Sequence, residues 1–476
     1  MPFTQLISLV ILLVQVLGLL NAAHAVMNVR SSQGAIAWSL ALIGLPWIAI
    51  PLYWTLGRTR FKGYPEAIRQ AYARYEARAP LIVENLRPYL APLPEEIKPL
   101  EKLVSTLSEL PCTSGNQVTL LVDGDATFEA MLAAIHGARD YILFQFYIVK
   151  DDDIGREVMA ALIAKAQQGV RVCFSYDEIG SHQLSRATRL RLRNSGVQVT
   201  AFKSTKGFGN SFQLNFRNHR KILVVDGSVG FVGGLNIGDE YLGRDRHFGD
   251  WRDTHLRIQG PAVKCLQLSF QKDWYWATDH TDLANWEISP PPEASESVLI
   301  LPSGPADDYQ TCTLFFNSIF NLAQQRLWIA SPYFVPDEAT LATLKMAALR
   351  GVDVRIILPA NPDHQIVYLC SFSYYTELKK AGIKLYRFRK GFMHQKVVLV
   401  DNLMAGVGTV NLDNRSFHLN FEVMAFMLQG PALTQVEAML LKDLENSDLV
   451  DLDDYHRRPL KFRLAVRAAR LMAPLQ

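Results

Sequence analysis

Residues 218–236 read NHRKILVVDGSVGFVGGLN, and residues 393–411 read MHQKVVLVDNLMAGVGTVN. Both stretches contain a His-x-Lys pair, an Asp five residues after the Lys, a glycine seven residues after the Asp, and an Asn three residues after that glycine. The shared polar residues are His219, Lys221, Asp226 and Asn236 in the first stretch and His394, Lys396, Asp401 and Asn411 in the second. A pattern of this length, written twice, predicts two copies of one structural unit that carry one kind of chemistry.

The aliphatic runs that follow each Lys, ILVV and VVLV, predict buried strands. Side chains alternate along a strand, so the His and the Lys of each pair are expected on one face. The Asp lies an odd number of residues beyond the His and is expected off that face. Asp226-Gly227 and Asp401-Asn402 instead predict turns that close a hairpin, and we interpret both aspartates as architectural members of the motif.

An imidazole next to an ammonium group suits phosphate chemistry. The Lys supplies a fixed positive charge for a phosphoryl oxygen, and the imidazole can attack phosphorus or carry a proton. Ordinary strand residues facing solvent are the alternative, which the repetition of the whole string argues against. The predicted catalytic set is therefore the six motif residues His219, Lys221, Asp226, His394, Lys396 and Asp401.

The duplication extends beyond the two motifs. Gly169 opens GVRVCFSYD and Gly351 opens GVDVRIILP, each after an alanine-rich stretch with a helical pattern. QGPAVKCLQLSFQKD, from residue 259, parallels QGPALTQVEAMLLKD, from residue 429. Strand and helix alternate in both halves, which predicts an α/β fold with mixed, mostly parallel sheets flanked by helices. A pseudo-twofold arrangement of the halves would bring His219 and His394 to one cleft.

The amino-terminal region is apolar. Residues 3–26 contain no charged side chain and are long enough to cross a bilayer, and residues 35–56 form a second apolar stretch with four Trp or Tyr residues for the interface. The sequence thus predicts a two-helix transmembrane hairpin within residues 1–60. A signal peptide is the competing interpretation of the first stretch, because Ala23-His24-Ala25 is similar to a cleavage site.

Basic residues follow the second apolar stretch, whereas only Arg30 lies between the two stretches. The positive-inside rule then predicts a multi-pass protein whose catalytic halves face the cytoplasm. We expect a helical linker at 61–115, the first half at 116–280, a Pro-rich linker at 281–297 and the second half at 298–450. Residues 451–476 form a basic amphipathic tail that suits an anionic membrane surface, or that packs on its own domain.

Five scattered cysteines, with no CxxC pair and no His cluster at ligand spacing, predict neither a disulfide framework nor a metal site. The sequence contains no dinucleotide fingerprint and no Walker loop. We therefore expect no cofactor and no metal, with the chemistry performed by side chains alone. The formal net charge of +3 is small, so the basic tail matters more than the total.

The two His-Lys-Asp motifs resemble those of the HKD superfamily of phospholipase D. Together with WSLALIGLPW and PLYWTLGRTRFKGY near the amino terminus, they resemble bacterial cardiolipin synthases over nearly the whole chain. The resemblance implies a bacterial inner-membrane enzyme with two phospholipase D-like halves around one active site. It would transfer a phosphatidyl group from one phosphatidylglycerol to another, releasing glycerol, with membrane lipid as its partner and no role for nucleic acid.

The resemblance also implies residue roles. His219 would be the nucleophile that forms a phosphohistidine, and His394 the general acid. Lys221, Lys396, Asn236 and Asn411 would hold the phosphoryl oxygens, and Asp253 and Glu422 would orient the imidazoles. The last pairing is offset, because alignment of the Gln-Gly dipeptides at 259 and 429 places Glu422 against Arg252 instead of Asp253.

Other functions remain open at this point. A phospholipase D would use water as the acceptor, and a membrane-tethered nuclease is possible because related HKD proteins cut DNA. The basic residues cluster near the apolar stretches instead of forming an aromatic and basic groove along the halves, which argues against the nuclease. A scaffold with a dead site is disfavoured by the intact His, Lys and Asn in both copies.

Overall fold

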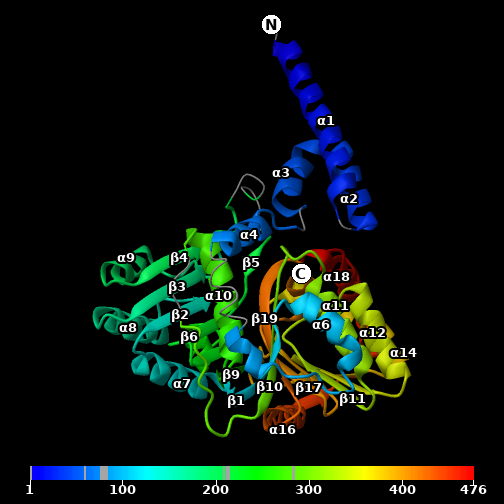
Figure 1. The fold of residues 1–476 in the computed structure, drawn as a ribbon. Coiled ribbons are helices and arrows are strands. Elements are labelled where there is room, and N and C mark those ends of the chain that lie inside the picture. Colours follow the sequence, from blue (N-terminus) through cyan, green and yellow to red (C-terminus); the bar gives the residue numbers. More distant parts are fainter. Residues whose placement is uncertain are drawn as a thin grey trace.

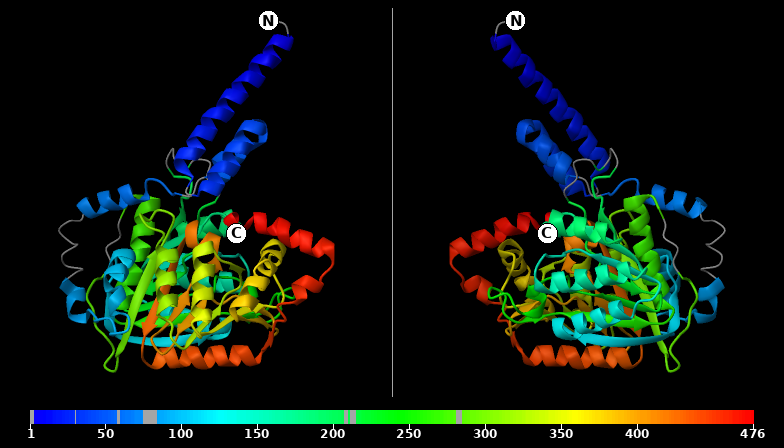
Figure 2. Two further views of the ribbon diagram at one scale, coloured as in Figure 1. Left: turned by 90° about the vertical axis from the view of Figure 1, so that its right-hand side faces the viewer. Right: turned by 90° about the vertical axis from the view of Figure 1, so that its left-hand side faces the viewer.

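The computed structural model describes residues 3–29, 31–57, 60–74, 84–206, 210, 215–280 and 285–476. Two α/β halves lie side by side, and a helical extension projects from one end of the pair (Figures 1 and 2). Sixteen of the described strands form one continuous sheet that runs through both halves, because β1 (Cys112–Val122) pairs with β10 (Glu296–Ser303) in antiparallel orientation.

The first half follows a strand and helix alternation. Its elements are α7 (Asp123–Gly137), β2 (Tyr141–Phe146), α8 (Asp153–Gln167), β3 (Arg171–Asp177), α9 (Arg186–Asn194), β4 (Gln198–Phe202), β5 (Arg217–Asn218), β6 (Ile222–Val225), β7 (Val229–Gly233), β8 (Trp251–Arg252), β9 (Thr254–Gln259) and α10 (Ala262–Thr278). The motif strands β6 and β7 pair as the predicted hairpin.

The second half repeats this order. Its elements are α11 (Thr311–Leu322), β11 (Arg326–Ala330), β12 (Phe334–Val335), α12 (Glu338–Leu349), β13 (Asp353–Pro359), α13 (Gln365–Phe372), α14 (Tyr375–Ala381), β14 (Lys384–Phe388), β15 (Phe392–Met393), β16 (Val397–Val400), β17 (Met404–Gly408), β18 (Leu412–Asp413), α15 (Asn414–His418), β19 (Asn420–Leu428), α16 (Pro431–Glu445) and β20 (Ser447–Leu449). Here β16 and β17 form the second hairpin.

The prediction of a mostly parallel sheet is wrong. The parallel pairs of the main sheet are β2 with β3, β3 with β4, β11 with β13, and β13 with β14. The motif hairpins, the strands β9 and β19 that flank them, and the junction of the halves are antiparallel. Consecutive parallel strands within one half need a long crossover connection, usually a helix, and the hairpin connections are too short to hold one.

Two short parallel pairings exchange strands between the halves. In the first, β5 of the first half pairs with β19 of the second, with Asn420 opposite Arg217 and Phe421 opposite Asn218. In the second, β15 of the second half pairs with β8 of the first, with Phe392 opposite Trp251. Each exchanged strand ends immediately before a motif histidine, so these pairings fix how the two motifs face each other.

The predicted second membrane-spanning helix, residues 35–56, is broken. The chain forms α1 (Phe3–Asn28), α2 (Ser32–Gly44) and α3 (Pro46–Leu56), and the break falls at Leu45, whose backbone leaves the helical region before Pro46. Of the described helices, only α1 is long and apolar enough to cross a membrane. The structure therefore shows one apolar helix of spanning length, and it does not show the predicted two-helix hairpin.

The rest of the chain packs around the halves. The region between α3 and β1 contains α4 (Tyr64–Arg74), α6 (Glu101–Ser108) and the short 3-10 turns η1 (Arg87–Tyr89) and η2 (Lys98–Leu100). After β20 come α17 (Asp454–Arg457), α18 (Leu460–Leu471) and η4 (Ala473–Leu475). Helix α18 packs on the second half, since Val466 is fully buried and the Arg470 guanidinium lies 4.1 Å from the centre of the Tyr374 ring.

Candidate active site

His219 is held by a carboxylate of the other half. Its Nδ1 lies 2.8 Å from Oε2 and 3.1 Å from Oε1 of Glu422, which is fully buried. The Asn420 side-chain amide donates to the same carboxylate at 3.1 Å. Because the carboxylate accepts the hydrogen bond, Nδ1 carries the proton and Nε2 keeps its lone pair.

His394 has the mirror-image arrangement. Its Nδ1 lies 2.8 Å from Oδ2 of Asp253, which is also fully buried and accepts a second hydrogen bond, at 2.8 Å, from the backbone N–H of Thr254. The two histidines are therefore oriented crosswise, each by a carboxylate of the opposite half.

The strand register explains this crosswise arrangement. The pairing of β5 with β19 places Phe421 opposite Asn218, so the next residues in line are Glu422 and His219. The pairing of β15 with β8 places Met393 opposite Arg252, followed by His394 and Asp253. Glu422 and Asp253 are thus equivalent positions, and the one-residue offset noted in the sequence arises after them. The strand pairs confirm this, with Gly233 opposite His255 and Gly408 opposite Met424.

The two motif lysines lie beneath the histidines. Lys221 Nζ donates to the backbone oxygen of His219 at 2.8 Å, and Lys396 makes the same contact to His394. Burial lowers the pKa of Lys221 to about 7 and that of Lys396 to about 8, against the opposing attraction of nearby carboxylates. The positive charge of Lys396 contributes to lowering the pKa of Lys221, which places both lysines in one site.

Both imidazoles are neutral in the ligand-free site. Burial lowers the pKa of His219 to about 4; the Glu422 charge opposes this, and the Lys221 and Lys396 charges add to it. Burial and the Lys396 charge likewise lower the pKa of His394 to about 4, against the opposing Asp253. A neutral imidazole with a free Nε2 is a nucleophile or a base, and it becomes an acid only after something raises its pKa.

The motif lysines and histidines come just before the strands that were expected to contain them, since β6 begins at Ile222 and β16 at Val397. The motif aspartates follow those strands. Asp226 accepts three backbone hydrogen bonds from residues 139–141, and Asp401 accepts three from residues 324–326. Both have a positive φ, 52° and 47°, as turn residues do. The structure places them away from the imidazoles, at the far ends of β6 and β16.

The two asparagines differ. Asn236 is satisfied by the protein, because its side-chain oxygen accepts from the Ile148 N–H at 3.0 Å and its nitrogen donates to the Tyr241 hydroxyl at 2.9 Å. The side-chain oxygen of Asn411 is buried and has no hydrogen-bond partner in the described part of the chain. Of the two, Asn411 is the one whose side-chain amide is incompletely hydrogen-bonded within the described residues.

Aromatic side chains that are not part of the two repeated motifs line the site. The Tyr147 ring meets His219 edge-on with 4.9 Å between ring centres, and the Trp251 ring lies 5.2 Å from His394. Tyr147 opens YIVKDD and Tyr333 opens YFVPDE, so a further comparison of the two repeats could have found Tyr147. The sequence offers no such signal for Trp251.

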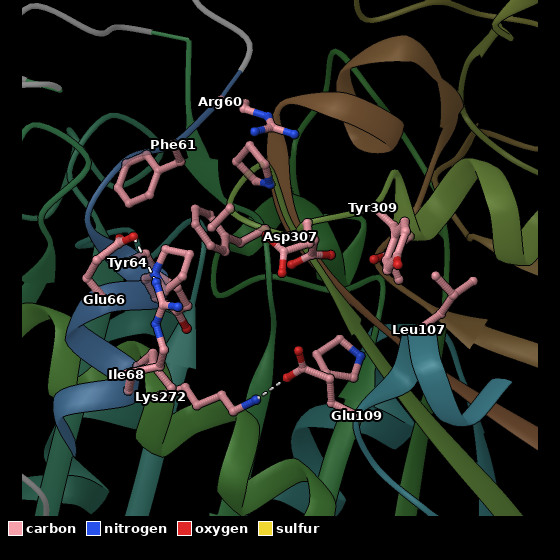
Figure 3. Close-up of a pocket in the computed structure, with 18 of the residues that line it drawn as sticks. Arg60, Phe61, Tyr64, Glu66, Ile68, Leu107, Glu109, Lys272, Asp307 and Tyr309 are labelled. Carbon is pink, nitrogen blue, oxygen red and sulfur yellow. Dashed lines mark hydrogen bonds and ion pairs between the residues drawn. The ribbon is translucent and has the colours of Figure 1, made fainter. Parts of the chain in front are cut away.

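A separate cavity of about 780 Å³ lies between α4, α6 and the chain after β10 (Figure 3). None of the six motif residues lines it, although Arg220 and Phe421, the neighbours of His219 and Glu422, do. An ion pair of 2.8 Å between Lys272 and Glu109 lies at one side. The lining contains both basic and acidic side chains, so it favours no single ligand charge: Arg60, Lys62, Arg69, Lys272, Glu66, Glu109, Asp307 and Asp308.

Comparison with known proteins agrees with the duplicated architecture. A family model described as "Cardiolipin synthase, PLD-like domain" matches residues 131–274 and 317–444. The chain is 46% identical over 471 residues to cardiolipin synthase A of Pseudomonas fluorescens (strain Pf-5), covering 98% of this chain and 97% of that protein. It is also 46% identical to cardiolipin synthase A of Pseudomonas aeruginosa (strain LESB58), covering 100% of this chain and 97% of that protein.

Among solved structures, phosphatidylserine synthase of Haemophilus influenzae Rd KW20 superposes with a TM-score of 0.60 at 16% identity, covering 79% of this chain and 99% of that one. That likeness concerns the fold, a pair of α/β halves. The family model covers more than half of the chain, and the similarity to both Pseudomonas proteins is nearly full length. The chain belongs to the cardiolipin synthase family of phospholipase D-like proteins.

Proposed function

We propose that the protein joins two molecules of phosphatidylglycerol to give cardiolipin and glycerol. The observation that carries the proposal is the crossed pair of carboxylate-held imidazoles, His219 on Glu422 and His394 on Asp253, each with a buried lysine beside it. This arrangement supplies two nitrogen atoms with proton-transfer capacity and two positive charges, which are the requirements of a double displacement at phosphorus. The membership of the chain in the cardiolipin synthase family supports the choice of lipid.

The proposed reaction has two steps. In the first, Nε2 of His219 attacks the phosphorus of the donor lipid, the P–O bond to glycerol breaks, and His394 gives its proton to the departing glycerol oxygen. In the second, the terminal hydroxyl of the acceptor lipid loses its proton to His394, its oxygen attacks phosphorus, and the P–N bond to His219 breaks. Both histidines end as they began, and no outside reagent is needed.

The electrostatics of the site constrain this scheme. With both pKa values near 4, neither imidazole is protonated at neutral pH. A bound phosphodiester anion opposes that lowering, because a negative charge close to the ring favours the imidazolium form. We therefore infer that binding of the donor lipid raises the pKa of His394 and so prepares the general acid. Lys221, Lys396 and Asn411 are proposed to hold the phosphoryl oxygens.

The membrane anchor fits these substrates, since phosphatidylglycerol remains in the bilayer. We propose an inner-membrane location with the catalytic halves on the cytoplasmic side, as the basic residues after α3 favour. The α18 helix supports a membrane next to this end of the halves, because it lies at the end from which α1 projects (Figure 2). Its Leu460, Leu464 and Leu471 are 60% exposed or more and recur along one face.

The test is incubation of the purified protein with vesicles of pure phosphatidylglycerol. We expect cardiolipin and glycerol in equal amounts. Phosphatidic acid as the main product would instead indicate a phospholipase D that uses water. In a parallel incubation with DNA, degradation of the DNA without lipid turnover in the vesicles would indicate a nuclease. The doubly substituted His219→Ala, His394→Ala protein is the inactive control.

A further inference from the structure

The surroundings of the two histidines differ, although the motifs themselves are alike. The chain before His219 carries Arg217, and the equivalent position before His394 is Phe392. Four residues after Asn411 comes Arg415, and four residues after Asn236 comes Glu240. The His219 side of the site therefore has two arginines where the His394 side has an aromatic ring and a carboxylate.

Contacts bring the two arginines together across the halves. Arg217 belongs to β5, two residues before His219, and its partner strand is β19. Arg415 belongs to α15, and its Nη2 donates at 2.6 Å to the backbone oxygen of Asn215, two residues before Arg217. Burial lowers the pKa of Arg415, and the charge of Arg217 lowers it further, as expected for neighbouring cations.

Tyr147 connects the two arginines, Arg217 and Arg415, to the catalytic centre. The Tyr147 ring packs edge-on against His219, at 4.9 Å between ring centres, and the Lys221 ammonium lies 5.6 Å from the centre of the same ring. Both Arg217 and Arg415 act to lower the pKa of Tyr147, against the dominant effect of burial, which raises it. Arg217, Arg415 and Tyr147 are all partly exposed, so a bound ligand can reach them.

Acidic groups near the pair are already engaged with the backbone. Asp177 accepts from the N–H groups of Ile179, Gly180 and Asn218, and Asp413 accepts from that of Ser416. On the His394 side, by contrast, Glu240 is paired with Lys150 at 2.6 Å, and Phe392 stacks near the imidazole. Two cationic side chains thus lie near His219, and neither of the equivalent positions on the His394 side, Phe392 and Glu240, carries one.

We propose that Arg217 and Arg415 bind the phosphate of the acceptor phospholipid. This inference rests on the proposed function, in which two anionic lipids meet and their phosphates end one glycerol apart. The His and Lys pairs take up the donor phosphate, and the second phosphate needs its own cations nearby. Guanidinium groups suit it, because they donate to phosphate oxygens in pairs.

The test compares a charged and an uncharged acceptor for the same donor. Wild-type protein and Arg217→Gln and Arg415→Gln variants are given labelled phosphatidylglycerol in detergent micelles, with and without ethanol. Ethanol has no phosphate, so its transfer product, phosphatidylethanol, reports on the catalytic centre alone. We expect cardiolipin formation to fall roughly 10- to 100-fold in each variant, the value of a charge-assisted hydrogen bond, while phosphatidylethanol formation stays within about threefold.

The results distinguish a failure of the inference about the two arginines from a failure of the proposed function. Equal loss of both products would overturn the inference and show that the arginines only support the fold of the site. Retention of both products would overturn it as well. Absence of cardiolipin from the wild-type reaction would instead defeat the proposed function. Arg415→Lys should show a smaller loss of cardiolipin formation than Arg415→Gln, and Arg191→Gln, on the exposed surface of α9, is the matched control.

A second inference comes from the amino-terminal helices. The turn between α2 and α3 packs against the middle of α1: Gln15 Nε2 donates to the Ile43 oxygen at 2.9 Å, and a side chain at Gly18 would meet the Leu42 oxygen and Pro46. The other end of α3 lies near the end of α1, where His24 Nδ1 lies 2.7 Å from the Tyr53 hydroxyl. Helices α2 and α3 therefore rise to the middle of α1 and return (Figure 1).

Helix lengths agree with this geometry. At 1.5 Å per residue, the 26 residues of α1 extend roughly 39 Å, whereas the 13 residues of α2 extend only about 20 Å, less than the approximately 30 Å of a hydrocarbon core. We infer that α1 crosses the bilayer and that α2 and α3 form a re-entrant hairpin. The Phe3 end of α1 then lies across the membrane from the catalytic halves, and Ser31 lies on their side.

Labelling of introduced cysteines with a membrane-impermeant maleimide distinguishes this from two full spans. In intact spheroplasts we expect Thr4→Cys to react and Ser31→Cys to react only after lysis, as should Asn194→Cys on the exposed surface of the first half. Two full spans would reverse the first two results and so overturn the inference. The five native cysteines are buried, which keeps the background low.

Discussion

Replacement of Asp253 by Asn removes the negative charge of this side chain and keeps its size, so it tests what the charge contributes to activity. Asp253 is fully buried, and its Oδ2 accepts from His394 Nδ1 at 2.8 Å. An asparagine of the same size can still accept with its amide oxygen, but it carries no charge to stabilise a protonated imidazole. If His394 is the general acid, the variant should lose much of its ability to protonate the departing glycerol.

The expected size of the effect follows from the electrostatics of the pair. Burial alone would raise the pKa of Asp253, but the hydrogen bond and charge of His394, with the charge of Lys396, lower it from 3.8 to about 2. That net lowering corresponds to roughly 2 to 3 kcal/mol. The same energy withdrawn from the transition state would slow the reaction on the order of 60-fold.

The assay uses two donors. One is phosphatidylglycerol, whose glycerol must be protonated as it leaves, and the other is a phosphodiester with a p-nitrophenol leaving group, which needs no acid. We expect Asp253→Asn to slow turnover of the first by about 60-fold and single-turnover release of p-nitrophenol by less than about fivefold. Glu422→Gln should slow both, because Glu422 holds the proposed nucleophile His219.

Equal losses with both donors for Asp253→Asn would refute the assignment of His394 as the general acid. If Asp253→Asn slows turnover of phosphatidylglycerol by less than about threefold, the charge of Asp253 is not important for the reaction. Asp250→Asn provides the control, because Asp250 is exposed and lies only three residues earlier.

Four further outcomes are expected. With labelled phosphatidylglycerol, His394→Ala should retain a covalent label and His219→Ala should not; the reverse would exchange their roles. Gly234→Ala should cost at least about tenfold in activity, because the new Cβ would lie 2.0 Å from Asp253 Oδ1; unchanged activity would show that the carboxylate can move without harm. Asp273→Asn should lower the free energy of unfolding by about 3–5 kcal/mol, measured as a lower melting temperature. The reason is that the buried Asp273 carboxylate pairs with Arg220 and accepts hydrogen bonds from Tyr64, Gln145 and Asn218. The exposed Asp279→Asn is the control. Finally, the pKa values of His219 and His394 are about 4 in the folded protein, below the ordinary 6.5 of the unfolded chain. The unfolded state therefore takes up protons first as the pH falls. The fold has its full stability above pH 6.5 and loses up to about 3 kcal/mol per histidine as the pH falls toward 4. Melting temperatures across that range should fall less in His394→Asn than in the wild type.

Local rules explain how the hairpins could be predicted. The aliphatic runs ILVV and VVLV, followed by Asp226 and Asp401 in turns, form β6 and β16 with their partner strands. The same local view misjudged the rest of the sheet, because alternation of helix and strand does not reveal which strands return through short connections. Hydropathy predicts one span at residues 35–56, because it does not register the break at Leu45.

The sequence alone determined that this protein has two copies of one phosphate-directed motif, with the lysines and histidines that carry the proposed chemistry, because a repeated string is visible without coordinates. Only the tertiary structure decided that Glu422 serves His219 and Asp253 serves His394. That choice depends on the register of β5 with β19 and of β15 with β8, strands from opposite halves. Pairing between segments some 140 to 200 residues apart is set by how the halves pack, and no local pattern in the chain records it.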